Sequence, residues 1–279
     1  MQLTKDLYHY TSAESLKGII SNQSLWATNI GFLNDDQEYK YLVDLLIPQI
    51  ERLKNTTNKF LLERIIQLIK ANEDGETSGS YVFSLSEEPD LLSQWRAYCK
   101  DGGFSIGFDH QGIVELTNQN NTFLFKCIYE RNQQLDLIQN FIDALSDELS
   151  KLPQPIQDKN EALRFWGEHI RQQITKLANI IKHPSFHEEK EWRIVKINVN
   201  ITDPQLNHRP FKGLFIPYYS ISFNHTNKFI PIKRIIVGPH KYAKLSKRSV
   251  FEFIQSEKIK RNSQISTKFK ISEIPHREF

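Results

Sequence analysis

The stretch from Phe186 to Val195 carries the pattern that most constrains how this chain can fold. Two carboxylates, Glu189 and Glu191, lie two positions apart where a charged segment turns into the alternating run 192–199. Alternation is typical of a β-strand, in which side chains two positions apart share one face. We therefore expect both acids on one face at the entrance of a strand, where they could line a cleft. The alternative interpretation is an exposed, charged strand end.

Length and composition predict a soluble globular protein. The chain has 279 residues, 39% of them hydrophobic and 25% charged, which suits one large domain that carries a helical insert. We find no apolar run long enough to span a membrane and no signal-peptide core at the N-terminus. Cys99 and Cys127 lack metal-ligand spacing, so we expect both to be reduced and buried. A cytoplasmic location is expected.

Positive charge is concentrated near the C-terminus. Residues 232–279 contain 12 Lys or Arg and four Glu, a net charge of +8, whereas residues 1–231 carry 24 Lys or Arg and 29 Asp or Glu, a net charge of −5. Clustered cations bind polyanions by releasing counterions from phosphates, which favours a nucleic-acid partner. A solvated helix face is the alternative explanation.

The order of predicted elements indicates an α+β fold with a mixed, largely antiparallel β core. The chain opens with a strand at 7–11, a helix that Ser12 can cap, and a strand at 24–28. Residues 131–185 are expected to form a helical insert that packs over the sheet, and 232–279 a basic C-terminal part of the same single domain, 1–279. Further strands are expected at 81–86, 104–108, 121–130, 191–199, 213–223, 232–238 and 266–274, and further helices after residue 36 and at 59–71, 91–99 and 242–259.

Common catalytic and cofactor motifs are missing from the sequence. The nine histidines form no His-x-x-x-His pattern, and we find no Cys-x-x-Cys, Gly-x-Ser-x-Gly or Gly-x-Gly-x-x-Gly. Gly102-Gly103 lacks the lysine and the following helix of a phosphate loop. We therefore expect no metal. A Cys–His nucleophilic pair stays open, although no cation near Cys99 in the sequence would activate its thiol.

Three predicted strands carry polar side chains that could meet. The first has His9, which should point away from Tyr8 and Tyr10; the second has Ser84 and Ser86; and the third has the two glutamates. A buried structural histidine is the usual explanation of a residue such as His9. A ring in this position could also bind a ribose hydroxyl.

The sequence contains an ordered set of short motifs. They are Leu7-Tyr-His-Tyr-Thr-Ser12, Ser24-Leu-Trp-Ala-Thr28, Phe32-Leu-Asn-Asp35 with Glu38, Phe83-Ser-Leu-Ser86, Gln94-Trp-Arg-Ala-Tyr-Cys99 with Gly102-Gly103-Phe104, Glu189-Lys-Glu-Trp-Arg193 and Arg234-Ile-Ile-Val-Gly-Pro239. This set resembles the bacterial domain-of-unknown-function 2971 family, members of which are found near phage-defence and toxin–antitoxin genes. The resemblance implies a toxin or a defence effector of abortive infection, and a partner such as an antitoxin or chaperone.

The order of a His strand, a Ser strand and a Glu-x-Glu strand is also similar to that of ADP-ribosyltransferases. The resemblance implies NAD as co-substrate, with Glu191 on the nicotinamide-ribose 2′-hydroxyl and the oxocarbenium ion, and Glu189 orienting or deprotonating the acceptor. His9 would bind a ribose, and Tyr10 or Tyr81 would stack against nicotinamide. The implied catalytic residues are Glu191 and Glu189, and the implied NAD-binding residues are His9, Tyr10, Thr11, Tyr81, Ser84 and Ser86.

The expected function is therefore NAD-dependent ADP-ribosyl transfer, to a nucleic acid (RNA or DNA) or to a protein. Two alternatives stay open: a catalytically silent module that binds a nucleotide or a partner, and a metal-independent nuclease. The spacing of the carboxylates would also admit the acid pair of a hydrolase. The enzyme hypothesis requires His9 and Glu191 to line one cleft.

Overall fold

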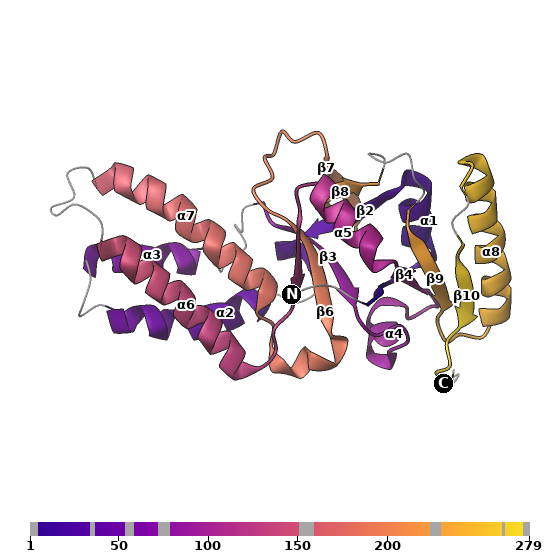
Figure 1. Cartoon of the computed structure of the whole chain (residues 1–279), viewed down its shortest axis with the longest axis horizontal. Helices are drawn as coiled ribbons and strands as arrows, with labels where there is room; N and C mark the ends of the chain where they lie inside the picture. Colours follow the sequence, from indigo (N-terminus) through magenta and orange to yellow (C-terminus); the bar gives the residue numbers. More distant parts are fainter. Residues whose placement is uncertain are drawn as a thin grey trace.

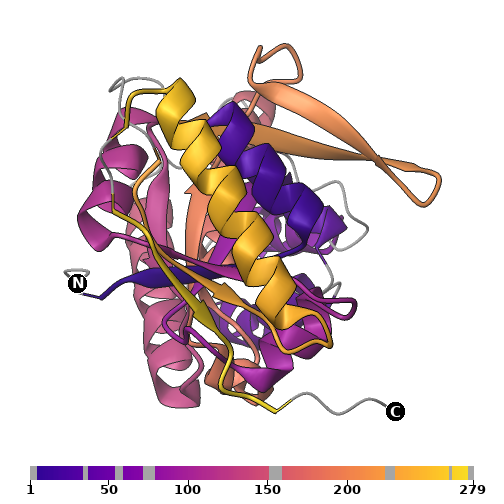
Figure 2. The same cartoon turned by 90° about the vertical axis from the view of Figure 1, so that its right-hand side faces the viewer.

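The structure is a computed structural model, and it describes residues 5–33, 37–53, 59–71, 79–150, 159–223, 230–263 and 266–275. Asn34 and Asp35 of the third family motif lie outside these residues. Figures 1 and 2 show a β-sheet with helices around it and a helical lobe at one side. None of the described helices combines the length and apolar composition that a membrane crossing needs.

Helices and strands follow one another along much of the chain, as the sequence predicts. The strands are β1 (Leu7–Thr11), β2 (Ser24–Asn29), β3 (Tyr81–Ser86), β4 (Phe104–Phe108), β5 (Phe123–Lys126), β6 (Glu191–Lys196), β7 (Leu206–Phe211), β8 (Leu214–Ser222), β9 (Ile232–Val237) and β10 (Lys268–Ile271). The helices are α1 (Ala13–Asn22), α2 (Gln37–Arg52), α3 (Lys59–Ala71), α4 (Leu92–Tyr98), α5 (His110–Gln119), α6 (Arg131–Ser150), α7 (Lys159–Ile180) and α8 (Ala243–Lys260), with 3₁₀ turns η1 (Ile30–Phe32) and η4 (Pro184–Glu189).

The sheet is mixed and largely antiparallel, which confirms the predicted α+β class. Its strands run in the order β10-β9-β4-β1-β3-β2-β8-β7, and β6 and β5 continue from β3. Each strand pair is antiparallel except β9 with β10, which is parallel. Ser12 caps α1 as expected, because its Oγ accepts a hydrogen bond from the Ser15 amide at 3.2 Å.

The sheet forks at β3. On one edge β3 pairs with β6 along its whole length, from Tyr81 to Ser86. On the other edge it pairs with β1 only at Ser86 and with β2 only at its first two residues. Strands β1 and β2 therefore diverge along the middle of β3. A fork of this kind leaves a gap inside the sheet that side chains can line.

Two helical layers cover the sheet. One face packs against α1, α5 and α8 in a large apolar core that includes Ile20, Ile113 and Ile254. On the other face, α4 contributes Trp95 to a smaller cluster with Tyr8 and Tyr10. Figure 2 shows α1 and α8 side by side, and the β7–β8 hairpin extending away from the body.

The helices within 131–185 form a separate lobe, which differs from the expected insert over the sheet. Helices α6 and α7 pack with α2 and α3 around their own apolar core, with Leu46 and Ile142 among its buried residues. Figure 1 shows this lobe to the left of β6. The apolar stripes of α2 and α3 are the reason, because they supply the partners that α6 and α7 need.

The sheet and the helical lobe have separate apolar cores, so a core substitution in one of them should destabilise that part first. Ile142→Ala should remove about 2–5 kcal/mol of stability, because Ile142 is buried in the helical lobe. We expect faster amide hydrogen exchange in α2, α6 and α7, and unchanged protection in β3 and β4.

The matched control is Ile106→Ala, which removes the same groups from the sheet core, where Ile106 is fully buried. It should weaken protection in the strands first. Equal loss of protection in lobe and sheet for both variants would show that the two cores unfold as one unit.

Candidate functional site

A pocket of about 310 Å³ opens in the fork of the sheet. This volume lies at the lower end of the range for ligand sites, roughly 300–1,000 Å³. Most of the residues predicted from sequence line it together with side chains that were not predicted. The predicted ones are His9, Tyr10, Thr11, Ser84, Ser86, Glu189 and Glu191, and the others include Trp26, Thr28, Phe32, Glu38, Tyr98, Lys182, Arg193 and Arg209.

His9 stands in the fork between β1 and β3. Its Nδ1 lies 2.9 Å from the Ser84 carbonyl oxygen, and its ring stacks on Phe83 at 4.1 Å. Because a carbonyl only accepts, Nδ1 carries the proton. Burial lowers the pKa of His9 to about 4, so the ring is neutral at neutral pH. Nε2 is then an acceptor, which suits a ligand hydroxyl.

Tyr10 is held firmly beside the pocket. Its hydroxyl donates to the Glu88 carbonyl at 2.7 Å and accepts from the Leu91 amide at 2.9 Å, and its ring meets Trp95 edge-on at 4.7 Å. A phenol fixed on three sides cannot swing onto a ligand. Tyr10 therefore shapes the wall rather than offering a free stacking face.

The two predicted glutamates meet, but not by the strand geometry expected from their spacing. Glu189 ends the 3₁₀ turn η4, Lys190 adopts a left-handed conformation with φ 43°, and β6 starts only at Glu191. Ser86 stabilises this turn, because its Oγ donates to the Glu189 carbonyl at 2.6 Å. The turn, and not a regular strand, brings Glu189 to the pocket.

Glu191 forms a buried ion pair with Arg193, the next residue on the same face of β6. Arg193 Nε and Nη2 donate to the two carboxylate oxygens of Glu191 at 2.9 and 3.0 Å. Burial alone would raise the pKa of Glu191, but Arg193 and Lys182 together lower it to about 2. Glu191 is therefore a permanent anion near neutral pH and cannot act as a general acid.

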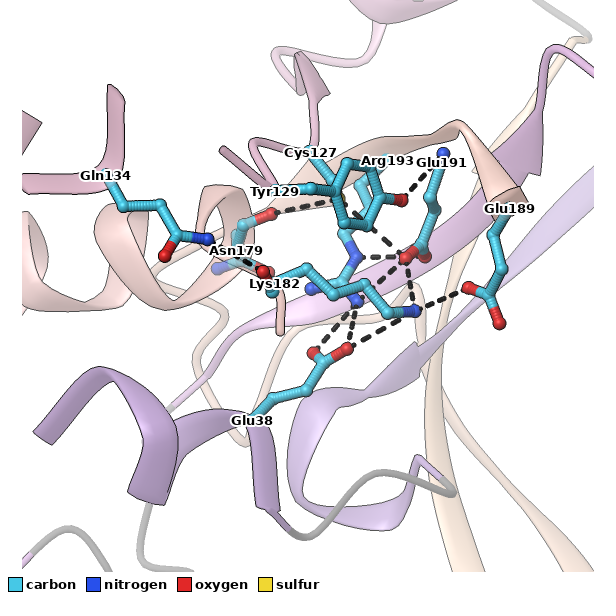
Figure 3. A network of polar contacts seen from close by, with 9 residues as sticks. All are labelled: Glu38, Cys127, Tyr129, Gln134, Asn179, Lys182, Glu189, Glu191 and Arg193. Carbon is cyan, nitrogen blue, oxygen red and sulfur yellow. Dashed lines mark hydrogen bonds and ion pairs between the residues drawn. The ribbon is translucent and has the colours of Figure 1, made fainter. Parts of the chain in front are cut away.

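Lys182 and Glu38 extend this pair into a network, drawn in Figure 3. Lys182 Nζ lies 2.7 Å from Glu189, 2.8 Å from Glu191 and 3.4 Å from Glu38, and these carboxylates raise the pKa of Lys182 although burial lowers it. Arg193 Nη2 also donates to both oxygens of Glu38. Three carboxylates thus surround two cations, which leaves the network with a formal charge of −1.

Exposure separates the three carboxylates. The side chains of Glu38 and Glu191 are 6% exposed, whereas that of Glu189 is 17% exposed. Lys182 pairs with Glu189, and both Lys182 and Arg193 pair with Glu38 and with Glu191. Of the three, Glu189 is the one best placed to exchange its partner for a substrate.

Both cysteines are free and buried, as the sequence predicts. Burial raises the pKa of Cys99 to about 11 and that of Cys127 well above its ordinary value. Cys127 lies beside the network, where its Sγ is 3.7 Å from Glu191. A thiol with a raised pKa is a poor nucleophile near neutral pH, which argues against a Cys–His pair.

Tyr81 lies apart from the other predicted residues. It is 5% exposed, belongs to the sheet core and packs against Tyr219 with ring centroids 6.3 Å apart. Stacking of Tyr81 on a ligand in the pocket is therefore not supported. Phe32 and Tyr98 also line the pocket and are more exposed, at 43% and 44%.

One group of potential metal ligands lies elsewhere, at the start of β1 and of α5. Asp6, Asp109 and His110 have ligand atoms within 4.8 Å of one another. Lys233 Nζ lies 3.0 Å from Asp6 and 3.6 Å from Asp109. A lysine in this position already pairs with both carboxylates, so the group is better explained as an ion-pair cluster.

Comparison with known proteins finds a match to one family over part of the chain. Residues 94–194 match the family described as "Protein of unknown function (DUF2971)". The matched segment runs from α4 to β6, so it includes Lys182, Glu189, Glu191 and Arg193 and leaves out His9. This match agrees with the family resemblance that the motifs predicted. No curated protein and no solved structure matches the chain.

The ion network predicts a large effect of one substitution on stability. Glu191→Gln should cost about 3–5 kcal/mol, because it breaks the buried ion pairs of Glu191 with Arg193 and Lys182. Urea denaturation of both proteins near neutral pH measures the difference. The exposed Glu252 on α8, whose side chain is 61% exposed, provides the control Glu252→Gln, which should cost under about 1 kcal/mol.

The same network predicts a pH dependence. The pKa of Glu191 is lower in the folded protein than in the unfolded chain, where it is about 4.3, so its contribution is complete above that value. It is lost as the pH falls toward 2. The difference between wild type and Glu191→Gln should therefore shrink between pH 5 and pH 2. A constant difference over this range would contradict the ionised state of Glu191.

His9 allows a direct spectroscopic test of its tautomer. We expect Nδ1 to be protonated and Nε2 unprotonated between pH 6 and 8, because the Ser84 carbonyl fixes the proton and burial lowers the pKa to about 4. Two-dimensional NMR of ¹⁵N-histidine-labelled protein reports both nitrogens. His9→Gln assigns the signal. A titration midpoint near 6.5, or a proton on Nε2, would disprove this arrangement.

Proposed function

We propose that this protein is an NAD-dependent ADP-ribosyltransferase that binds NAD in the pocket of the forked sheet. The observation that carries the proposal is the meeting of His9, Ser84, Ser86, Glu189 and Glu191 at one pocket, although they come from three strands and a turn. The enzyme hypothesis required His9 and Glu191 to line one cleft. Their placement in one pocket supports the proposal and makes it testable.

The pocket suits the nicotinamide riboside part of the co-substrate. Neutral His9 would accept a hydrogen bond from a ribose hydroxyl through Nε2. Phe32 or Tyr98 would supply the aromatic face that the resemblance implied for Tyr10 or Tyr81. The basic C-terminal part, including α8, favours a nucleic acid as acceptor over a protein.

Ionised carboxylates suit the bond cleavage. When the bond between nicotinamide and C1′ of the ribose breaks, its electron pair leaves with nicotinamide, and positive charge develops on the ribose. Glu191, a fixed anion, would stabilise this charge. Glu189 would take the proton of the acceptor nucleophile as the new bond to C1′ forms. A chain of this type in a defence system would act as an intracellular toxin.

One feature of the network favours a second function. Both oxygens of Glu191 already accept hydrogen bonds from Arg193, and Oε2 also accepts one from Lys182. These cations weaken the field that Glu191 exerts on a cationic transition state. A module that binds a nucleotide or a partner protein without turning it over would tolerate such pairing, and it is the alternative we propose.

The two functions predict different outcomes with labelled NAD. Purified protein is incubated with NAD labelled in its adenylate phosphate and with separate pools of RNA, single-stranded DNA and cell protein. We expect label in one pool and release of nicotinamide, and a loss of rate on the order of a hundredfold in Glu189→Gln, the size of effect that removal of a catalytic base produces. Glu252→Gln should keep the wild-type rate.

Glu189→Gln is preferred to Glu191→Gln here, because the side chain of Glu189 is more exposed, so its replacement should leave the fold intact, which circular dichroism checks. Nicotinamide release without labelled product would indicate NAD hydrolysis. Binding of NAD without release of nicotinamide would favour the binding module. If the folded protein neither binds nor cleaves NAD, the proposal is wrong.

A further inference from the structure

Arg209 lines the pocket from the outer hairpin of the sheet. It lies on β7, the edge strand that pairs with β8. Its Nη2 donates to the Thr28 hydroxyl on β2 at 3.2 Å. The side chain therefore crosses from the hairpin to the strand that borders the fork. This contact uses one of the five N–H donors of a guanidinium group.

No carboxylate pairs with Arg209 among the residues that the structure describes. Arg193 and Lys182, the other cations at the pocket, are each held by carboxylates. Arg209 instead has a lowered pKa because it is half-buried, and only Tyr218 acts in the opposite direction. A half-buried guanidinium group without an anion is costly, and a bound anion would offset that cost.

The positive charge of Arg209 also acts on His9. Its charge contributes to the lowered pKa of His9, after the larger effect of burial. The pocket thus places a cation near a neutral acceptor for hydroxyl groups. A ligand that combines a hydroxyl-bearing sugar with an anionic group matches both, and phosphate is the anion that a guanidinium fork binds best.

We propose that Arg209 forms an anion subsite and binds the phosphate group of a nucleotide whose ribose contacts His9. Only the choice of nicotinamide as the base rests on the proposed function. The sugar and phosphate contacts rest on the two side chains themselves. For NAD, the subsite would take the phosphate next to the nicotinamide ribose.

Matched pairs of probes test this subsite. Nicotinamide mononucleotide and nicotinamide riboside differ only by a phosphate group, as do AMP and adenosine, and isothermal titration calorimetry gives the Kd of each. In wild type we expect the phosphorylated member of at least one pair to bind about tenfold more tightly. Arg209→Gln should reduce this ratio to about one, and Arg209→Lys, which keeps the charge, should retain part of it.

Arg248→Gln is the control, because Arg248 lies on α8, is 77% exposed and does not line the pocket; it should behave as wild type. An unchanged ratio in folded Arg209→Gln, or no effect of phosphate in wild type, would overturn the subsite. Binding of AMP that depends on Arg209, without any binding of the nicotinamide nucleotide, would support the subsite and contradict the NAD proposal. Cleavage of NAD, together with a Kd ratio that does not depend on Arg209, would support the NAD proposal and contradict the subsite.

Discussion

The buried ion network holds the two apolar cores of this protein together. Glu38 belongs to α2 and Lys182 follows α7, so both come from the helical lobe, whereas Glu191 and Arg193 belong to β6 of the sheet. Apolar contacts are not directional, and charge-assisted hydrogen bonds are. The network therefore fixes the orientation of the lobe against the sheet at the point where the pocket lies. The same side chains that join the lobes supply the carboxylates of the pocket.

This double role explains why a charge network is buried at all. Burial of ionised groups costs free energy that their mutual attraction offsets only when the geometry is good. Here each cation has at least two carboxylate partners, and Arg193 donates to both oxygens of Glu38 and of Glu191. An apolar joint would hold the lobes equally well but would leave no charge at the pocket. The ion network, in contrast, has one carboxylate more than it has cations, and we propose that Glu189 is the carboxylate that serves the chemistry of the pocket.

Sequence reasoning found much of this arrangement but not the network. Alternation predicted β1, β3 and β6 and hence His9, Ser84 and Ser86, because side-chain direction in a strand follows from spacing alone. The turn at Lys190 was missed, since a left-handed residue other than glycine gives no local signal. The pairing of Glu38 with Lys182, which are 144 positions apart in the sequence, depends on how the helical lobe packs against the sheet. The exposed hairpin strand β7 and helix α5 have weak apolar patterns, so they and Arg209 were not predicted.

The position of His9 has a consequence for which residues this site tolerates. At Ser84, neither β1 nor β2 pairs with β3, so no strand donates to the Ser84 carbonyl from that edge. His9 Nδ1 donates to it instead. A backbone acceptor in such a place needs a donor whatever the pocket binds. The sheet itself therefore restricts position 9 to side chains that can donate to Ser84 and still keep β1 away from β3. The imidazole therefore acts as a spacer between β1 and β3 and also lines the pocket.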